Sequence, residues 1–471
     1  MTYLRLPLPG RWLWSELPKM RKQVQVAFTI SLVVLTQLAL ALVPATRQMA
    51  AFEAVMDDVA SRGKDGFGHA GGYAAPFLAD PTAEVKRLMA AAGEAVDPEV
   101  GAMPEDIIRR WGYPVELYDV VTEDGYILSV YRIPHGRNAT AASSGPRPVV
   151  FLQHGLECSC TNWIANLPNE AAAFILADAG FDVWMGNFRG NTYSKRHVSL
   201  SPLSHEYWQF SWDQMARYDL PAMINLALNV SGAVRLYYMG HSMGTLTAFA
   251  HFSQDLEFAK KIIKFYALGP VVTVKYIKGV FRFFAPFINY LDALFKLVGM
   301  DEFLPNSWLM QELAKYFCGN PVSDSVCSDI IFLFAGPDSH QMNVTRLPVY
   351  ISHTPAGTST MNIIHFGQMV ESKKCQMYDY GKKENRIRYN QDHPPEYDVS
   401  RMQVPVALYW GALDWLATPG DVEELIPKLQ NIFDNRYLQE FNHLDFIWGL
   451  RAAPEAYEPI SNDIKTDFYK T

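Results

Sequence analysis

The chain has 471 residues, of which 49% are hydrophobic, so it is long enough for one large domain with an insertion around a sizeable core. Charged residues make up only 19%, which argues against a disordered mature chain. The formal net charge of −8 and the lack of a basic run argue against nucleic acid as a partner.

The N-terminal segment predicts entry into the secretory pathway. Residues 26–43 form an apolar stretch behind the basic cluster Lys19–Lys22, and small residues near Ala45 suit cleavage by a signal peptidase. A start at Met20 would give a compact basic region before this stretch, so we expect a signal peptide within residues 1–45. A retained membrane anchor is the alternative, because an apolar stretch of 18 residues is at the lower limit for spanning a bilayer.

Other features of the chain also suit an oxidising, glycosylating compartment. Triplets of the form Asn-X-Ser/Thr, which accept N-linked glycans, occur at Asn138, Asn229 and Asn343. Glycosylation serves both secreted and lysosomal proteins, so we expect one of these destinations and leave the choice between them open.

The five cysteines are an odd number, which leaves at least one free thiol or an intermolecular bridge. Cys318 and Cys327 flank a polar loop with Gly and Pro and could close a small ring. Cys158 and Cys160 are separated by one residue, and we interpret them as buried thiols rather than as a bridge. Cys375 stands alone in the sequence.

Composition divides the rest of the chain into four parts. Residues 46–104 are rich in Ala, Gly and Asp, and we expect a flexible or weakly helical N-terminal extension, or a propeptide. From Glu105 the character changes, and residues 105–272 predict the first part of an α/β core. We interpret residues 273–398 as an insertion and residues 399–471 as the second part of the core.

Strand-like runs alternate with helical windows in the first part of the core. The stretch "VELYDVVTEDGYILSVYRI" predicts a hairpin around Asp124-Gly125. Short buried strands follow in "RPVVFLQHG", "GFDVWMGNFRG" and "VRLYYMGHS", with helical windows "NEAAAFILADA" and "SWDQMARYDLPAMINLAL" between them. This alternation predicts an α/β fold with a mostly parallel sheet that helices cover on both faces.

Ser242 lies where the third of these buried strands should become a helix. It is the centre of a G-x-S-x-G pattern, the nucleophile elbow, in which Gly240 and Gly244 remove side chains that would collide with the neighbouring strand and helix. The dipole of the helix behind the serine favours the negative charge of a transition state. A plain Gly-Ser turn is the alternative interpretation, and we interpret His241 as structural.

A serine nucleophile needs a base, and the base needs an orienting carboxylate, in the chain order Ser, acid, His. The apolar run "VPVALYWGALDWLATP" leads to Asp414, the helical window "GDVEELIPKL" follows, and "NRYLQEFNHLDFIWG" leads to His443. The pair could also be a solvated loop acid and a core histidine. We interpret Asp445 as structural. The histidines that compete for the base are His340, His353, His365 and His393.

An oxyanion hole requires two backbone N–H groups. One is expected from Met243, directly after the nucleophile, and the other from the loop that follows "FLQHG", where Leu156 is the candidate donor. An ordinary turn at the end of the strand is the alternative interpretation of this loop.

Several stretches resemble the acid lipase family, which includes gastric lipase and lysosomal acid lipase. They are "LQHGLECSCTNWIANLPNEAAAFILADAGFDVWMGNFRGNTYS", "TEDGYIL", "FYALGPVVTVKY", "HTPAGTSTMNIIHFGQ" and "NHLDFIWG". The resemblance covers roughly residues 104–460. It implies an α/β-hydrolase core with an inserted, mainly helical cap, and hydrolysis of triglycerides or steryl esters.

The same resemblance implies roles for individual residues. It matches Ser242, Asp414 and His443 to the nucleophile, acid and base, and Leu156 and Met243 to the oxyanion donors. It further matches the pair Cys318 and Cys327 to a disulfide in the lid, and Asn343 to a glycosylation position.

Two departures from the family pattern stand out. Met243 occupies a position where the family commonly has glutamine, which leaves backbone donation intact but changes the polarity of the pocket. Cys158 and Cys160 stand beside the oxyanion loop where small residues are usual, so their oxidation could disturb that loop.

The insertion holds an apolar stretch, "YIKGVFRFFAPFINYLDALFKLVGMDEFLPNSWLM", which Pro286 and scattered charges exclude as a membrane span. It suits the inner face of a cap, and it also suits a surface that meets lipid when the cap opens. We therefore expect a serine lipase that meets its lipid ester at an oil–water or membrane interface, without a metal or organic cofactor, and monomeric. The alternatives are a non-catalytic lipid-binding protein on the same scaffold and a soluble carboxylesterase.

Overall fold

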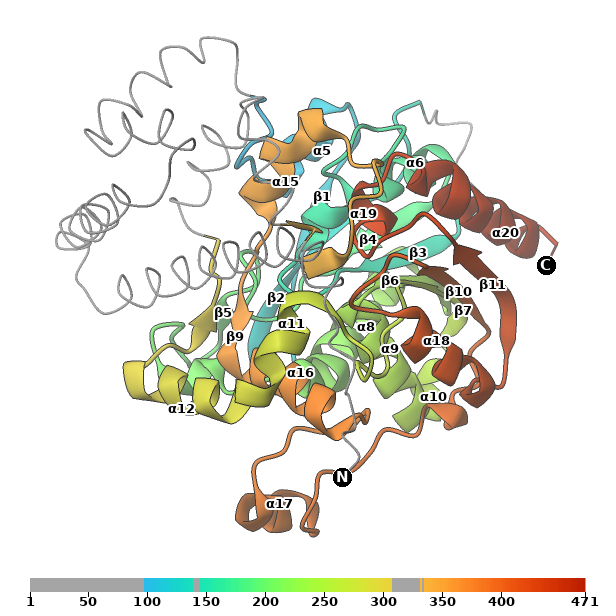
Figure 1. Cartoon of the computed structure of the whole chain (residues 1–471). Helices are drawn as coiled ribbons and strands as arrows, with labels where there is room; N and C mark the ends of the chain where they lie inside the picture. The colour runs from blue at the N-terminus through green and yellow to red at the C-terminus, as the bar shows by residue number, and fades with distance from the viewer. Residues whose placement is uncertain (1–96, 139–144, 307–330, 333, 471) are drawn as a thin grey trace, which may run out of the picture. The chain divides into compact units, whose positions relative to one another are not determined.

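The structure is a computed structural model that describes residues 97–138, 145–306, 331–332 and 334–470. The expected signal peptide, most of the expected N-terminal extension, and the pair Cys318 and Cys327 lie outside the described residues. Within the described chain, strands and helices alternate as the sequence predicts (Figure 1).

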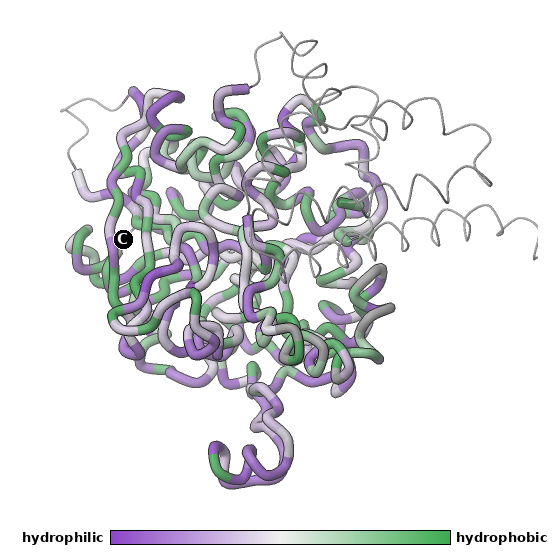
Figure 2. Tube along the Cα trace, turned by 90° about the vertical axis from the view of Figure 1, so that its left-hand side faces the viewer, coloured by the Kyte–Doolittle hydropathy of each residue, from purple (hydrophilic) through white to green (hydrophobic). Residues whose placement is uncertain are grey.

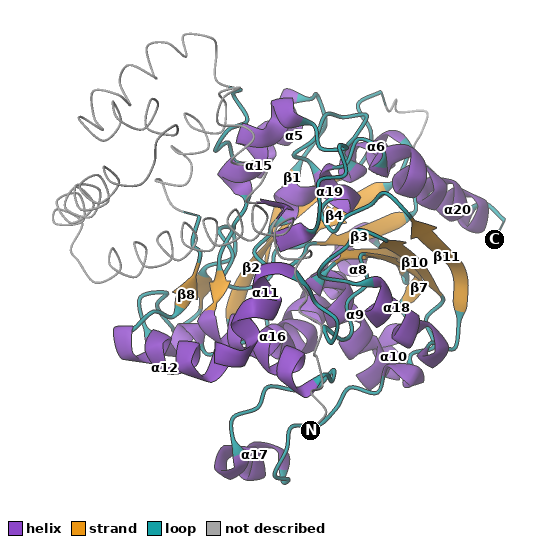
Figure 3. Ribbon diagram, viewed as in Figure 1, coloured by secondary structure: helices purple, strands orange, loops and turns teal. Residues whose placement is uncertain are grey.

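A long, mostly parallel sheet forms the centre of the described chain (Figure 3). The hairpin pairs β1 with β2 in antiparallel register, β2 also pairs β4 antiparallel, and every later neighbour in the path is parallel. The order across the sheet is β1 (Glu116–Val121), β2 (Tyr126–Ile133), β4 (Asp182–Met185), β3 (Val149–Gln153), β6 (Leu236–His241), β7 (Ile262–Leu268), β10 (Val406–Gly411) and β11 (Ile432–Leu438), and β5 (Arg196–His197) pairs with β2.

Helices cover both faces of this sheet, because the central strands are apolar on both sides. In β6, Leu236 and Tyr238 belong to one buried cluster, whereas Tyr237 and Met239 belong to another. A fully buried parallel strand is expected to read in this way as a continuous apolar run. The first cluster includes residues of α8 (Leu220–Ser231), α9 (Met243–Gln254) and α18 (Pro419–Leu425), and the second includes residues of α5 (Pro104–Arg110), α6 (Ala172–Asp178), α19 (Asp445–Trp448) and α20 (Glu458–Phe468).

The predicted insertion leaves the sheet after β7 and returns at β10, which are parallel neighbours. Its described part is mainly helical and carries one short antiparallel pair. Its elements are α11 (Gly279–Phe284), α12 (Ile288–Val298), β8 (Glu302–Phe303), α15 (Leu347–His353), β9 (Thr358–Ser359), α16 (Thr360–Ser372) and α17 (Lys382–Tyr389).

The insertion is also part of the core, a feature that the sequence did not indicate. Tyr350 of α15 is fully buried and stacks on Trp448, with ring centroids 4.7 Å apart. By contrast α17 projects as a mostly hydrophilic segment at the lower edge of the structure (Figure 2). No helix of the described ranges is long and apolar enough to cross a bilayer.

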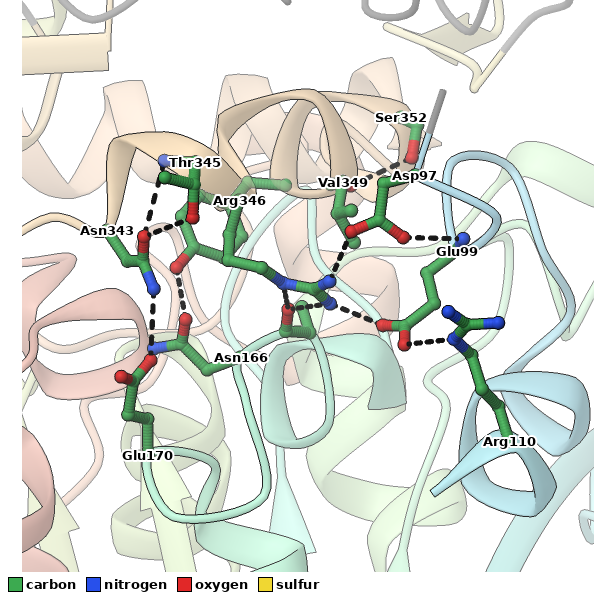
Figure 4. Close-up of polar contacts among 12 residues, drawn as sticks. Asp97, Glu99, Arg110, Asn166, Glu170, Asn343, Thr345, Arg346, Val349 and Ser352 are labelled. Atoms are coloured by element: carbon green, nitrogen blue, oxygen red, sulfur yellow. Dashed lines mark hydrogen bonds and ion pairs between the residues drawn. The ribbon is translucent and has the colours of Figure 1, made fainter. Parts of the chain in front are cut away.

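A buried arginine ties the start of the described chain to the insertion (Figure 4). Arg346 donates to Asp97 at 2.7 Å, to the carbonyl of Ala165 at 2.7 Å, and to Glu99. Glu99 also lies 3.3 Å from the guanidinium of Arg110 in α5. Residues from Asp97 onward thus belong to the folded core, which begins before the expected boundary at residue 105.

Candidate active site

The turn between β6 and α9 presents Ser242 at the carboxyl end of a central strand. The serine has φ 55° and ψ −120°, a conformation that is strained for a residue with a side chain. Its N–H group donates to the carbonyl of Leu268 at 3.1 Å, which fixes the turn to the neighbouring strand β7. The structure therefore contains the strand, tight turn and helix that the sequence predicts.

The two glycines of the elbow are required by close backbone contacts. A Cβ atom at Gly240 would lie 2.9 Å from the backbone of Gly244 in α9, and one at Gly244 would lie 2.4 Å from the carbonyl oxygen of Gln153 in β3. Both distances are well inside van der Waals contact, so any side chain would push the turn open. This agrees with the collision that the sequence predicts.

His443 and Asp414 come from the loops after β11 and β10, and the structure brings them together. Nδ1 of His443 donates to Oδ2 of Asp414 at 2.8 Å, and the residues are 2% and 0% exposed. The second oxygen of Asp414, Oδ1, accepts the N–H groups of Leu416 and Ala417, each at 2.8 Å. This carboxylate is thus held in one orientation, and it fixes the imidazole tautomer that carries its proton on Nδ1.

The opposite nitrogen of His443, Nε2, is buried and has no hydrogen-bond partner among the described residues. An unpartnered buried acceptor is unfavourable unless another group uses it. The backbone links this imidazole to the serine: the N–H of Ser242 binds the carbonyl of Leu268, and the adjacent Gly269 lies against the ring. The free nitrogen is therefore the one that a general base would use.

Gly269 is a site residue that the sequence analysis missed. It has φ +54°, and a Cβ atom there would lie 3.2 Å from Nδ1 of His443 and 3.4 Å from Oδ2 of Asp414. Only glycine meets both the left-handed backbone and the lack of space. A glycine directly after a predicted strand, in "FYALGP", was the available signal.

Backbone donors are available on two sides of Ser242. The N–H group of Met243 is the first of helix α9, where such groups have no partner within the helix. Gly155, just before Leu156, comes so close that a Cβ atom there would lie 2.9 Å from Cβ of Ser242. Neither Met243 nor Leu156 donates its N–H to any other group within the described ranges. These two groups can serve as an oxyanion hole.

His154 orients this loop, a role that the sequence analysis did not assign. Its Nε2 accepts the N–H group of Phe188 at 3.1 Å, so the ring proton is on Nδ1, which donates to the carbonyl of Gly155 at 2.8 Å. Burial lowers the pKa of His154 to about 4, which keeps the ring neutral. Because C=O and N–H point in opposite directions across a trans peptide, holding the carbonyl of Gly155 also aims the N–H of Leu156.

The other candidates near the site have structural roles. His241 is buried, and its Nε2 donates to the carbonyl of His443 at 2.9 Å, which holds the backbone of His443 in place. Asp445 accepts from the N–H of Asn442 at 2.6 Å and from the hydroxyl of Ser339 at 2.8 Å, rather than from His443. Both findings agree with the structural interpretation from the sequence.

The competing histidines make contacts elsewhere. His353 binds the carbonyl of Glu99 at 2.9 Å, and His365 is buried between Ser211 and the carbonyl of Gln376. His340 has an exposed side chain next to Asp338, and His393 is exposed.

The remaining predicted sites are dispersed over the described chain. Cys158, Cys160 and Cys375 are free and buried, which agrees with their interpretation as small apolar residues. Among the glycosylation candidates, Asn138 and Asn229 are exposed. Asn343 is partly buried, and its amide donates to Glu170 at 3.3 Å (Figure 4).

A cavity of about 530 Å³ lies between the described part of the insertion and the segment that holds His205 and Gln209. It is lined by apolar groups such as Ile288 and Met361 but also by acidic ones such as Asp292 and Glu371. Ser242, Asp414 and His443 do not line it. An acidic rim is unfavourable for an acyl chain, so this cavity is not the candidate ester site.

Comparisons with known proteins agree with this geometry. Residues 104–167 match a family model described as a partial alpha/beta-hydrolase lipase region, and residues 148–450 match the model of the alpha/beta hydrolase fold. A solved structure from Sulfolobus solfataricus shares the fold with a TM-score of 0.50 at 13% identity, covering 75% of this chain and 99% of its own.

The similarity to curated proteins extends over most of the chain. Lipase lipl-1 of Caenorhabditis elegans is 51% identical over 381 residues, which is 80% of this chain and 94% of that protein. Human gastric triacylglycerol lipase is 48% identical over 376 residues, or 79% of this chain and 92% of its own.

Proposed function

Since this chain belongs to the lipases of the alpha/beta-hydrolase family, we propose that Ser242, Asp414 and His443 are the catalytic triad with which it hydrolyses lipid esters. The family establishes that the protein is a carboxylic ester hydrolase. The observation that carries the residue assignment is the bond between His443 and Asp414, together with the unpartnered Nε2 of the same histidine.

The reaction begins when Nε2 of His443 takes the proton of the Ser242 hydroxyl as its oxygen attacks the ester carbonyl carbon. Asp414 holds the imidazole and stabilises its charged form. The N–H groups of Leu156 and Met243 bind the oxyanion that forms, a contribution of roughly 3 kcal/mol per donor.

The imidazolium of His443 then gives its proton to the departing alcohol, and the acyl group remains on Ser242. A water molecule repeats the attack, with His443 again as base, and the fatty acid leaves. Because the charges that develop are balanced by His443, Asp414 and backbone donors, the reaction requires no metal or organic cofactor.

The substrate is a neutral lipid ester, a triglyceride or a steryl ester. The printed name of the human relative, gastric triacylglycerol lipase, supports the first. The insertion between β7 and β10 acts as a cap that opens at an oil–water interface. Exposed apolar side chains on its described part, Tyr290 at 76% and Leu297 at 83%, support contact with lipid there.

Processing and destination form a further part of the proposal. A signal peptide within residues 1–45 directs the chain into the secretory pathway and is cleaved there, and the mature chain acts as a monomer outside the cell or in the lysosome. Cys318 and Cys327 form a disulfide in the lid, and Asn138, Asn229 and Asn343 carry glycans. Peptide mass spectrometry of the protein purified from its native source tests all of these modifications together.

The decisive experiment is Ser242→Ala, compared with wild type for hydrolysis and for labelling by a fluorophosphonate probe. The variant should lose turnover and labelling while its thermal unfolding midpoint is unchanged. Unchanged turnover by Ser242→Ala would contradict the nucleophile assignment, and a wild type that does not label would favour a non-catalytic lipid-binding protein.

A panel of triolein, cholesteryl oleate and a short soluble ester, at acid and neutral pH, separates the remaining alternatives. Activation at an emulsion surface is expected of the lipase. A soluble carboxylesterase would show its full activity on the short ester without an interface.

A further inference from the structure

Glu157 directly follows the proposed oxyanion donor Leu156 and has an unusual backbone. Its φ of 57° lies in the left-handed region, which is uncommon for a residue other than glycine, aspartate or asparagine. Such conformations persist when the surrounding structure determines them, and they gather at functional sites.

Glu157 binds the insertion through both its main chain and its side chain. Its main-chain carbonyl accepts the N–H group of Ala356 at 2.8 Å, and its carboxyl oxygen Oε2 accepts the N–H group of Gly357 at 3.1 Å. One residue of the oxyanion loop thus binds two consecutive N–H groups of the insertion, immediately before β9. The hydrogen bonds come from both the backbone and the side chain, so they fix position and orientation together.

The segment that Glu157 binds is itself held from another direction. The carbonyl of Ala356 accepts both the N–H group of Thr192, at 2.9 Å, and its hydroxyl, at 3.0 Å. Thr192 lies in the loop after β4, outside the insertion. Glu157 therefore attaches the oxyanion loop to a segment that the core also binds.

The carboxyl group of Glu157 lies in a dry environment. Its second oxygen, Oε1, is buried and has no hydrogen-bond partner within the described ranges. Burial raises the pKa of Glu157 well above its usual value, an effect that the nearby charge of Glu302 increases and that of Lys195 reduces. Burial thus opposes the charged form of this carboxyl, and its Oε2 offers an acceptor to Gly357 whether or not the group is charged.

We propose that Glu157 is a positioning residue for the oxyanion hole, which fixes the N–H group of Leu156 by binding the backbone of Ala356 and Gly357. The inference rests on the proposed function, since it takes Leu156 as a donor. Leu156 then lies between two supports: His154 holds the peptide before it, through the carbonyl of Gly155, and Glu157 holds the chain after it.

The test compares Glu157→Ala with Glu157→Gln in the full chain, on a short soluble ester. The alanine removes the acceptor for Gly357, so kcat should fall about 10-fold to 100-fold while KM stays within about twofold, because the hole acts mainly in the transition state. Glutamine keeps a neutral acceptor of the same length, and it should retain kcat within about threefold of wild type. A role limited to stability would not produce this separation of kcat from KM.

A matched control removes a hydrogen bond far from the site. Tyr113→Phe deletes the hydroxyl that donates to Asp178 at 2.6 Å, and its kcat should equal that of wild type. If Glu157→Ala does not fold, Glu157→Asp serves instead, because a carboxyl one methylene shorter is drawn away from Gly357. It should lower kcat in the same sense, with glutamine still restoring it.

Wild-type kcat in Glu157→Ala, or in Glu157→Asp where alanine does not fold, would overturn the proposal, as would a glutamine variant no better than alanine. Ser242→Ala assayed in parallel separates this outcome from a failure of the proposed function. If Ser242→Ala is inactive and the Glu157 variants are normal, only the positioning role is wrong. If Ser242→Ala stays active, the catalytic assignment on which this role depends is wrong as well.

Discussion

Gly269→Ala is expected to damage catalysis by displacing the base rather than by removing any catalytic group. A methyl group at residue 269 would lie 3.2 Å from Cε1 and Nδ1 of His443 and 3.4 Å from Oδ2 of Asp414. Those atoms are on both sides of the 2.8 Å bond that orients the imidazole. The ring must move by a few tenths of an ångström, and Nε2 must move with it.

Gly269→Ala has two separate effects, one on the folding free energy and one on kcat. Alanine at φ +54° is in the left-handed region, which costs about 1 to 2 kcal/mol of folding free energy. Misplacing a catalytic group by about 1 Å can cost about 100-fold in rate, so a displacement of a few tenths of an ångström should lower kcat by less, about 3-fold to 10-fold. That range corresponds to about 0.7 to 1.4 kcal/mol of transition-state stabilisation.

Gly232→Ala provides the matched control. Gly232 ends α8 with φ +73°, and a Cβ atom there would meet nothing within 4 Å. Both variants should lose similar stability in urea unfolding, whereas only Gly269→Ala should lose kcat on a short soluble ester. Equal kcat in the two variants would refute the argument that space beside His443 is what residue 269 provides.

Three further predictions concern charged groups. Asp414→Asn should lower kcat about 10³-fold to 10⁴-fold with the fold intact, because an amide no longer fixes the tautomer of His443. Stopped-flow acylation with a soluble ester measures the loss of rate, and a loss under tenfold would contradict the role of Asp414. Burial raises the pKa of Asp445 to about 6, so its ionisation opposes folding. Relative to Asp445→Asn, the wild-type unfolding free energy should fall by about 2 kcal/mol as pH rises from 4 to 6, and parallel denaturation curves across that window would exclude the effect. Arg346→Met should destabilise by about 3 to 5 kcal/mol in urea unfolding, because it removes the buried partner of Glu99 and leaves only the contact with Arg110. Adding Glu99→Met should recover part of the loss; equal stability of the single and double variants would argue against the pairing.

The sequence was sufficient to predict the order of strands and helices in the core, because the patterns that indicate them are local. The apolar runs of β3, β4 and β6 and the helical windows between them carry their periodicity within short stretches. The elbow around Ser242 is a local pattern too, since its glycines avoid collisions between residues close to the turn. The order of acid and base after the nucleophile came from the fold class that those signals indicated.

The structure was needed wherever distant segments meet. In the sequence, Gly269, His154 and Glu157 stand at strand ends or beside the candidate oxyanion donor. Nothing there indicated their roles, which depend on partners in other strands and in the insertion. The ionic cluster of Arg346 likewise joins the start of the described chain to the beginning of α15, across 249 residues of sequence between Asp97 and Arg346.

By itself, then, the sequence determined an alternating α/β chain with a serine, an aspartate and a histidine at strand ends, because short-range patterns encode strands, helices and tight turns. Only the tertiary structure decided which nitrogen of His443 is free, which backbone groups can receive an oxyanion, and how the insertion joins the core. Those properties depend on distances between residues far apart in the chain, and packing sets these distances only after the sheet has formed.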